Sequence, residues 1–454
     1  MRKSSKNLAQ VSMFLNTRLN AVWLLLQALG FWALGILLIL KSRLLVEWVT
    51  LSVQLLLVFL FLLSAGRFFS SVRKKQRALI LGNLLRALIS AALVVVLWIF
   101  HSRFWVLFPL LMGLYSLLIS FTHGLTFFQY AKERLPDNLV NFISALVHFV
   151  FGIIFIISMF SQNSPSFTVV GIYFLLYGAT VFMDFLSDII PSRNKARLKL
   201  HLRLALPAFL TTFLPLRAYA SIQRYLKKNG DTDLNASREG TGEPNVEVLI
   251  HVSGDPIGQF GHMDLCIEGK LITYGLYDES KRSLFNTKGP GVLVEHTEKE
   301  NYIQFLHRSA GTIVFGFGLC LSPEELERLY HKLTELHSRA YEWICDAALA
   351  DQGKIPQKEF TDYGSRIYLA TGARFYKFRK GSFKHYFALG VNCVKMADTL
   401  LVASGADTVV SGIVSPGTYF AYLNREFMRT GGRVVRRTVY KQIPESEQQE
   451  KHSS

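Results

Sequence analysis

Cysteine and charge are both scarce in this sequence. Its 454 residues include 4 cysteines, and charged side chains make up 18% of the chain. The cysteines match no zinc-ligand spacing and require no disulfide framework; they are Cys266, Cys320, Cys345 and Cys393. The glycine-rich stretch 254–261 comes before a strand pattern, so it lacks the helix that follows a phosphate-binding loop. The sequence therefore predicts no metal, no cofactor and no disulfide-stapled fold.

Acidic residues are few relative to basic ones. The chain has 50 lysines and arginines against 33 aspartates and glutamates, a formal net charge of +17. Such a balance is common in nucleic-acid-binding proteins. Here, however, many basic residues flank long apolar runs, as expected for attraction to anionic lipid head groups. The predicted partner is a phospholipid membrane and not a nucleic acid.

Apolar residues are abundant, at 50% of the chain. Six apolar stretches in the first half are each long enough to cross about 30 Å of hydrocarbon as a helix. They form three similar hairpins, because Ala28, Ala87 and Ala145 open successive units at nearly equal intervals. The stretches lie near residues 20–40, 46–66, 79–100, 104–125, 139–160 and 167–187. This half, roughly 20–190, resembles the HdeD-like membrane proteins, which implies a six-helix transmembrane domain over residues 1–190.

Lysine and arginine cluster on one side of these predicted spans. By the positive-inside rule, both ends of the chain are expected in the cytoplasm, and the protein in the plasma membrane. Residues 191–226 are basic and contain a short apolar stretch, 204–220, that holds Pro207 and Pro215. This segment is predicted to dock at the membrane interface. If 204–220 instead spans the membrane, the second half of the chain is extracytoplasmic.

The second half is predicted to be an α+β domain with an antiparallel sheet. Residues 227–245 are polar and glycine-rich, which indicates a flexible linker. Strand patterns and helix patterns then share residues 246–440, and Ser322-Pro-Glu-Glu325 has the form of a helix capping box. The tail 441–454 is polar and is predicted to be disordered.

The stretch from Asn392 to Gly405 predicts a helix that opens at Cys393. Backbone amides at a helix start favour a thiolate. His262 begins an alternating strand, and a cysteine on a helix with a histidine on a strand are the parts of a papain-like nucleophile pair. A third group must orient the imidazole, and Tyr274 and Asp278 are both candidates. His251 is expected to be a polar residue at a strand end.

The order of these parts carries a second resemblance. The C-terminal half is similar to the periplasmic domain of Lnb-type bacterial lipoprotein N-acyltransferases and, more broadly, to circularly permuted papain and NlpC-type enzymes. The motifs, in order, are Phe260-Gly-His262, Tyr274–Asp278 with Phe285 after it, Leu319–Glu325, Asn392-Cys393 and Asp398–Leu401. This resemblance implies a permuted papain-like domain in a bacterial protein, with acyl transfer through a Cys393 thioester.

The resulting hypothesis is a membrane-anchored cysteine hydrolase or acyltransferase that acts on an ester or amide of a lipid-linked substrate. Cys393 would be the nucleophile and His262 the base, supported by Tyr274 or Asp278 and by Asn392 beside the nucleophile. Two alternatives stay open. One is a non-catalytic receptor or scaffold with a papain-like ligand-binding domain. The other is a cell-wall peptide amidase, if the domain is extracytoplasmic. The sequence gives no indication of the oligomeric state.

Overall fold

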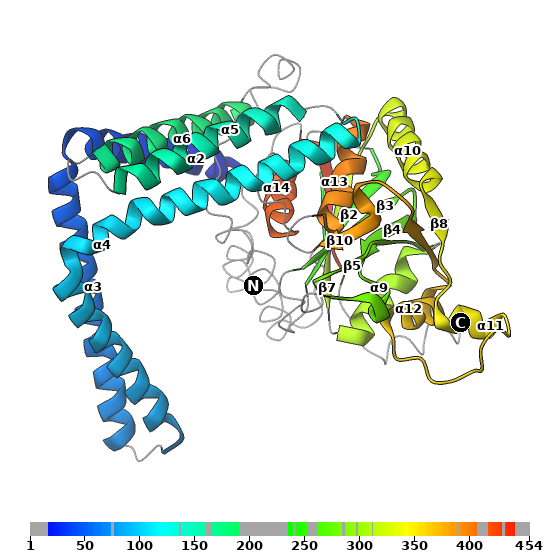
Figure 1. Ribbon diagram of the computed structural model, residues 1–454, viewed down its shortest axis with the longest axis horizontal. Helices are drawn as coiled ribbons and strands as arrows, with labels where there is room; N and C mark the ends of the chain where they lie inside the picture. Colours follow the sequence, from blue (N-terminus) through cyan, green and yellow to red (C-terminus); the bar gives the residue numbers. More distant parts are fainter. Residues whose placement is uncertain are drawn as a thin grey trace, which may run out of the picture. The chain divides into compact units, whose positions relative to one another are not determined.

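The structure is a computed structural model that describes most of the chain (Figure 1). The described residues are 17–73, 77–135, 138–159, 165–189, 235–238, 242–252, 261–283, 287–296, 298–310, 312–387, 391–405, 416–428 and 432–440. The predicted docking segment 191–226, with its apolar stretch 204–220, and the predicted disordered tail 441–454 lie outside them.

The chain forms two compact units. The first consists of Trp23–Ser120 and Leu146–Phe185, and the second of Met1–Val22, Phe121–Ala145 and Leu186–Ser454. The predicted membrane half therefore contributes Phe121–Ala145 to the unit that holds the sheet.

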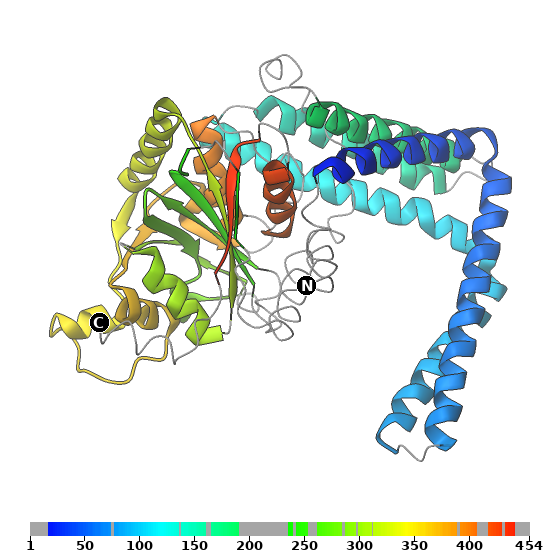
Figure 2. The same ribbon diagram turned by 180° about the vertical axis from the view of Figure 1, so that it is seen from behind.

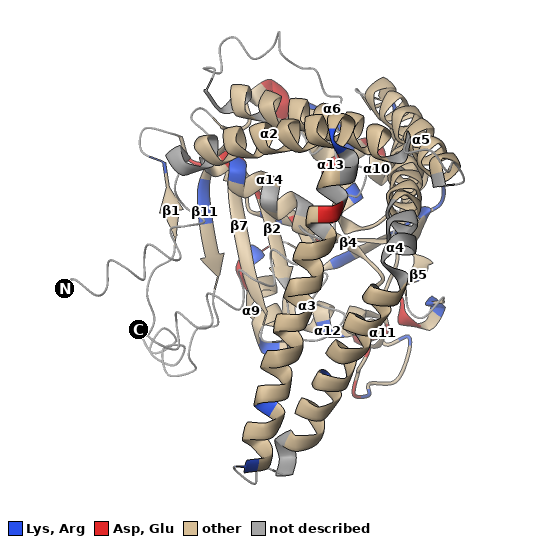
Figure 3. Cartoon of the chain, turned by 90° about the vertical axis from the view of Figure 1, so that its left-hand side faces the viewer, with Lys and Arg blue, Asp and Glu red and all other residues tan. Residues whose placement is uncertain are grey.

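Long apolar helices make up the described N-terminal half. They are α2 (Thr17–Leu40), α3 (Ser42–Arg73), α4 (Arg77–Lys132), α5 (Asn138–Met159) and α6 (Pro165–Ile189). Within the described residues, 4 stretches are long and apolar enough to cross a membrane: Val22–Leu40, Thr50–Arg73, Pro109–Lys132 and Asn138–Ser158. On α3 the charged residues lie toward the two helix ends (Figure 3). The described residues thus contain helices long and apolar enough to cross a membrane, which is compatible with the predicted membrane protein.

One predicted helix boundary is wrong. The stretches 79–100 and 104–125 belong to the single helix α4, which runs for 56 residues with Pro109 inside it. At 1.5 Å per residue such a helix is about 84 Å long, nearly three times the hydrocarbon thickness of a bilayer. His101-Ser-Arg103 interrupts the hydropathy of this region, but polarity alone does not break a helix. Among the described residues of this half, the predicted arrangement of six separate helices is therefore not confirmed.

Glycines allow close helix packing within the first unit. A Cβ on Gly35 of α2 would lie 2.8 Å from the carbonyl oxygen of Gly171 on α6. A Cβ on Gly113 of α4 would lie 3.1 Å from the carbonyl oxygen of Gly152 on α5. Small residues at such crossings let two backbones approach, which is how helices commonly associate in lipid. These contacts join α2 to α6 and α4 to α5.

The second unit is built on a nine-stranded antiparallel sheet with strand order β1-β11-β7-β2-β3-β4-β6-β9-β8. Its strands are β1 (Ala236–Ser237), β2 (Val246–Val252), β3 (His262–Ile267), β4 (Lys270–Gly275), β6 (Val292–His296), β7 (Ile313–Leu319), β8 (Ala340–Glu342), β9 (Arg374–Phe378) and β11 (Val434–Tyr440). A separate two-stranded ribbon pairs β5 (Lys288–Pro290) with β10 (His385–Phe387). The antiparallel α+β prediction is confirmed.

Helices cover both faces of this sheet (Figures 1 and 2). One core contains residues of α10 (Pro323–Ser338), α13 (Cys393–Ser404) and α14 (Pro416–Met428). The other contains residues of α9 (Lys299–Ala310), α11 (Asp346–Asp351) and α12 (Tyr363–Thr371). Short 3-10 turns lie at η3 (Glu279–Lys281) and η4 (Ser382–Lys384). The capping box predicted at Ser322 is present, since Glu325 N donates to Ser322 Oγ and Ser322 N to Glu325 Oε2.

Part of the predicted linker is built into the sheet. Ala236 and Ser237 pair with Arg437 and Arg436 of β11. The Arg238 guanidinium donates to the backbone carbonyl of Gly432, at 2.9 Å. The polar, glycine-rich composition of 227–245 did not reveal this strand, because a two-residue edge strand leaves no alternating pattern.

Candidate active site

Helix α13 begins at Cys393 because Asn392 caps it. The Asn392 side-chain oxygen accepts from Lys395 N at 3.1 Å, and Gly405 ends the helix in the left-handed conformation with φ of 84°. Both ends match the expected start and stop signals. Cys393 is 4% exposed and packs in the core beside Met263 and Tyr274.

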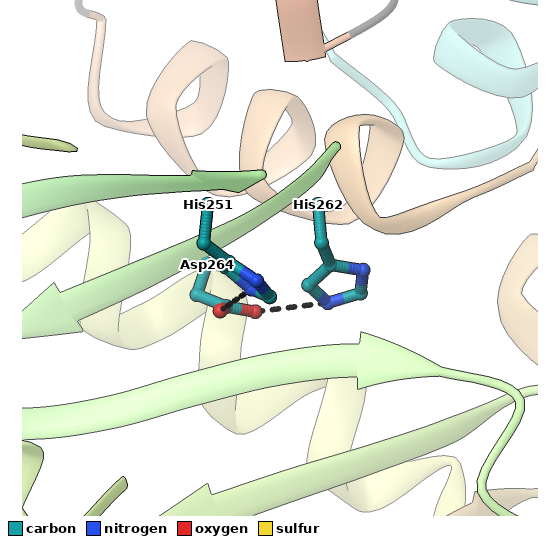
Figure 4. Close-up of side chains that lie close together, drawn as sticks. All are labelled: His251, His262 and Asp264. Atoms are coloured by element: carbon teal, nitrogen blue, oxygen red, sulfur yellow. Dashed lines mark hydrogen bonds and ion pairs between the residues drawn. The ribbon is translucent and has the colours of Figure 1, made fainter. Parts of the chain in front are cut away.

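Strands β2 and β3 bring two histidines to one carboxylate. Their antiparallel register pairs His251 with His262, and Asp264 follows two residues later, on the same face of β3. Figure 4 shows both imidazoles turned toward Asp264: His262 Nε2 lies 3.0 Å from Oδ1, and His251 Nε2 lies 2.9 Å from Oδ2. The Asp264 side chain is completely buried. The carboxylate therefore lies between two imidazoles that can each share a proton with it.

His262 also contacts Cys393. The two side chains lie close enough for each to shift the pKa of the other, and the backbone of Met263 also lowers the pKa of the Cys393 thiol. His262 Nε2 faces Asp264 and hydrogen-bonds Thr273 Oγ1 at 3.0 Å. This leaves Nδ1 as the ring nitrogen for the sulfur, and Figure 4 shows it turned away from Asp264. The structure thus brings together the two predicted residues and adds a carboxylate behind them.

The electrostatics of the site favour a thiolate. Burial raises the pKa of the Cys393 thiol, but the charge of His262 and its hydrogen bond outweigh burial and bring this pKa below its ordinary value. Burial lowers the pKa of His262, while the charges of Cys393 and Asp264 raise it well above its usual range. Both shifts favour a thiolate beside an imidazolium over the neutral pair, relative to the same two groups in water.

A shell of hydroxyl groups holds Asp264 and His262 in place. Tyr302 Oη donates to Asp264 Oδ2 at 3.3 Å. Thr273 Oγ1, which contacts His262, is also hydrogen-bonded to Tyr277 Oη at 2.8 Å. The remaining oxygen, Asp264 Oδ1, makes an ion-pair contact of 3.0 Å with His262 Nε2 and has no hydrogen-bond partner. The buried negative charge of Oδ1 therefore faces the imidazole of His262.

The two candidates for the third group need correction. Tyr274 Oη donates to the carbonyl of Phe383 at 2.9 Å and does not hydrogen-bond His262. Asp278 pairs with Lys377 Nζ at 2.6 Å. The residue that faces His262 is Asp264, and His251, expected to be only a polar strand end, is its second partner. The sequence does contain an indication of Asp264, because side chains two residues apart on a strand lie on the same face and Asp264 follows His262 by two residues.

His251, His262 and Asp264 also form a group that could hold a metal ion, since their ligand atoms lie within 4.8 Å of one another. Two imidazoles and a carboxylate suit zinc or iron. The N–O distances of 2.9 and 3.0 Å are those of protonated histidines on a carboxylate. The geometry accordingly fits both a carboxylate paired with two protonated imidazoles and a cation in place of the two protons.

The other cysteines differ from Cys393 in their electrostatic setting. Burial raises the pKa of Cys266 to about 11, and it also raises the pKa of Cys320 and of Cys345. A second buried imidazole, His296, has its pKa lowered by burial to about 4 and is neutral at pH 7. Cys393 is therefore the cysteine whose environment favours reactivity.

Together these groups can perform nucleophilic acyl chemistry. The thiolate is the nucleophile, the imidazolium beside it can protonate a leaving group, and the carboxylate keeps the imidazole in the productive orientation. The backbone amides at the start of α13 can stabilise an oxyanion. No family model matches this chain, and neither a curated protein nor a solved structure matches it.

Proposed function

We propose that this protein is a membrane-anchored cysteine hydrolase or acyltransferase that acts on an ester or amide, most readily one carried by a lipid. The observation that carries this proposal is the series Cys393–His262–Asp264, in which the thiol and the carboxylate are buried, the thiol pKa is lowered and the imidazole pKa is raised. The resemblance to Lnb-type and NlpC-type enzymes points to the same chemistry. The apolar helices support a substrate at the membrane, because tethering raises the effective concentration of lipid-linked molecules.

The reaction has two steps. The Cys393 thiolate attacks the carbonyl carbon, forming a carbon–sulfur bond and an oxyanion beside the start of α13. The oxyanion collapses and breaks the bond to the leaving alcohol or amine, which takes its proton from His262. In the second step water or an acceptor amine attacks the thioester, giving a proton to His262, and the thiolate leaves. Water as the acceptor makes the protein a hydrolase, and an amine makes it an acyltransferase.

The side of the membrane is part of this proposal. The distribution of lysine and arginine favours a cytoplasmic catalytic domain in the plasma membrane of a bacterial cell. A reporter fused after Ser454 tests it: activity of a cytoplasm-specific reporter is expected. Activity of a reporter that folds only outside the cytoplasm would favour the cell-wall amidase instead.

The decisive experiment uses the full chain in detergent with an activated long-chain acyl ester. A hydroxylamine-sensitive acyl adduct on Cys393 is expected by mass spectrometry, and Cys393→Ala should abolish both the adduct and turnover while the protein stays folded. An adduct on Cys266 or Cys320 would overturn the assignment. Stoichiometric zinc in the purified protein, lost in His251→Ala, would favour a metal centre. Ligand binding without any adduct would favour the receptor hypothesis.

A further inference from the structure

Helix α13, which carries Cys393, is buried on two different faces. One face packs against the sheet through Val394, Ala397 and Leu400. The other face carries Lys395 and Asp398, which are 6% and 1% exposed. Charged side chains are buried only where other groups satisfy them, since an unpaired buried charge is strongly destabilising. The polar face of α13 therefore requires a partner.

One partner is the C-terminal end of α4, which belongs to the same compact unit as α13. The Tyr419 hydroxyl of α14 also donates to Asp398. Lys395 Nζ donates to Thr126 Oγ1 at 2.8 Å, and Tyr130 Oη donates to Asp398 Oδ2 at 2.7 Å. Figures 1 and 2 show this end of α4 against α13. These contacts lie within about one and a half helical turns of Cys393, so a shift of α4 would move the nucleophile's helix.

Glu133, directly after α4, makes a second set of contacts. It is 1% exposed, and its carboxylate lies 3.2 Å from Lys332 Nζ and 2.7 Å from Arg339 Nη1. Lys332 lies on α10 and Arg339 directly follows this helix. Helix α10 in turn packs against α13. The end of α4 thus holds α13 directly and also through α10.

The opposite face of the same turns of α4 is apolar and exposed. Phe121, Leu125 and Phe128 are 62%, 39% and 68% exposed, and they recur at helical spacing. They lie in the candidate membrane span Pro109–Lys132. The last turns of α4 therefore present one face suited to lipid and another that satisfies buried charges beside the nucleophile.

We propose that Thr126, Tyr130 and Glu133 are positioning residues of the active site, and that they make the reactivity of Cys393 depend on how α4 is seated in the membrane. They touch no substrate and act through α13 and α10. This inference rests on the proposed function, since it takes Cys393 to be the nucleophile.

The first test compares two tyrosine variants of the full chain in detergent. Tyr130→Phe removes the hydroxyl that donates to Asp398 of α13. Tyr330→Phe is the matched control, because Tyr330 Oη donates to Glu268 Oε2, at 2.6 Å, and not to a residue of α13. The rate of Cys393 alkylation by iodoacetamide is measured against pH, together with turnover of a soluble thioester. A small displacement of a reacting group costs up to about a hundredfold. Tyr130→Phe is expected to lower kcat by about tenfold with KM unchanged and to shift the alkylation profile.

The second test needs no mutation. The wild-type chain is placed in nanodiscs of increasing acyl-chain length, which changes the tilt of a spanning helix. The alkylation rate of Cys393 is expected to vary with bilayer thickness, and to vary less in Tyr130→Phe. A folded Tyr130→Phe protein with the wild-type pH profile, or a wild-type rate independent of thickness, overturns the inference. If Cys393 is not alkylated at neutral pH even in the wild-type protein, the proposed function itself fails.

Discussion

Two buried carboxylates in the second unit have very different surroundings. Asp264 on β3 is 1% exposed and lies between His251 and His262. Asp278, in the turn after β4, is 5% exposed and pairs with Lys377. The pKa of each is below its ordinary value: burial raises both, but the histidine charges outweigh burial at Asp264, as the Lys377 hydrogen bond does at Asp278.

The difference lies in the partner. A lysine keeps its proton throughout the neutral range, so the Asp278–Lys377 pair is a fixed structural contact. A histidine gains or loses its proton in that range, so the partners of Asp264 can take part in proton transfer. A buried carboxylate with a permanent cation is thus a poor candidate for catalysis, and one between two histidines, of which His262 lies beside a thiol, is a good one.

The largest expected effect is on catalysis at Asp264. Asp264→Asn keeps the shape of the side chain but removes the charge that orients His262. By analogy with other triads, kcat is expected to fall by about 10²–10⁴-fold. Turnover of the acyl ester measures this. Asp278→Asn is the matched control and should keep wild-type kcat; equal losses in both variants would contradict the comparison.

The next effect is on stability at Asp278. Asp278→Ala leaves the buried Lys377 ammonium without its carboxylate, although the Trp343 ring, 4.0 Å from Nζ, remains beside it. Breaking a buried pair in this way costs about 3 kcal/mol of unfolding free energy. Denaturant unfolding measures the loss. Restoration of stability in the double variant Asp278→Ala, Lys377→Met is expected, and a single variant as stable as wild type would show the pair to be unimportant.

The pH dependence sharpens the comparison. Activity should be high between the lowered pKa of Cys393 and the raised pKa of His262, falling at lower pH as the thiolate is protonated and at higher pH as the imidazolium loses its proton. Because the charge of Asp264 raises the pKa of His262, Asp264→Asn should move the alkaline limb to lower pH. The residual kcat/KM of this variant is measured against pH. An unmoved limb would mean that another group sets the imidazole pKa.

The smallest effect is expected at the Tyr277 hydroxyl, which is hydrogen-bonded to Thr273. Tyr277→Phe removes one buried hydrogen bond and keeps the ring that stacks on Tyr363 at 5.8 Å. The expected cost is about 1 kcal/mol of unfolding free energy. Calorimetry of the two proteins measures it. A loss of unfolding free energy as large as that of Asp278→Ala would show that this hydroxyl contributes as much to stability as the ion pair.

Local features were predictable from the sequence. The helix from Cys393 to Gly405, the capping box at Ser322 and the apolar helices follow from signals within a few residues of each other. Asp264 lies two residues from His262 on the same strand, but a third group on the neighbouring strand fits the sequence pattern equally well, so Tyr274 and Asp278 were predicted instead. The two apolar stretches of α4 were predicted as separate helices because the polar residues 101–103 lie between them, although the helix continues through these residues.

The sequence by itself determined that apolar helices precede an antiparallel α+β domain, and that Cys393 opens a capped helix. These properties depend on composition, periodicity and capping residues, which act locally. Only the tertiary structure decided that His262 meets Cys393, that Asp264 and not Asp278 lies behind it, and that α4 satisfies the buried charges of α13. The physical reason is that strand register and helix packing join residues far apart in the chain, and a partner's identity depends on which surfaces are buried together.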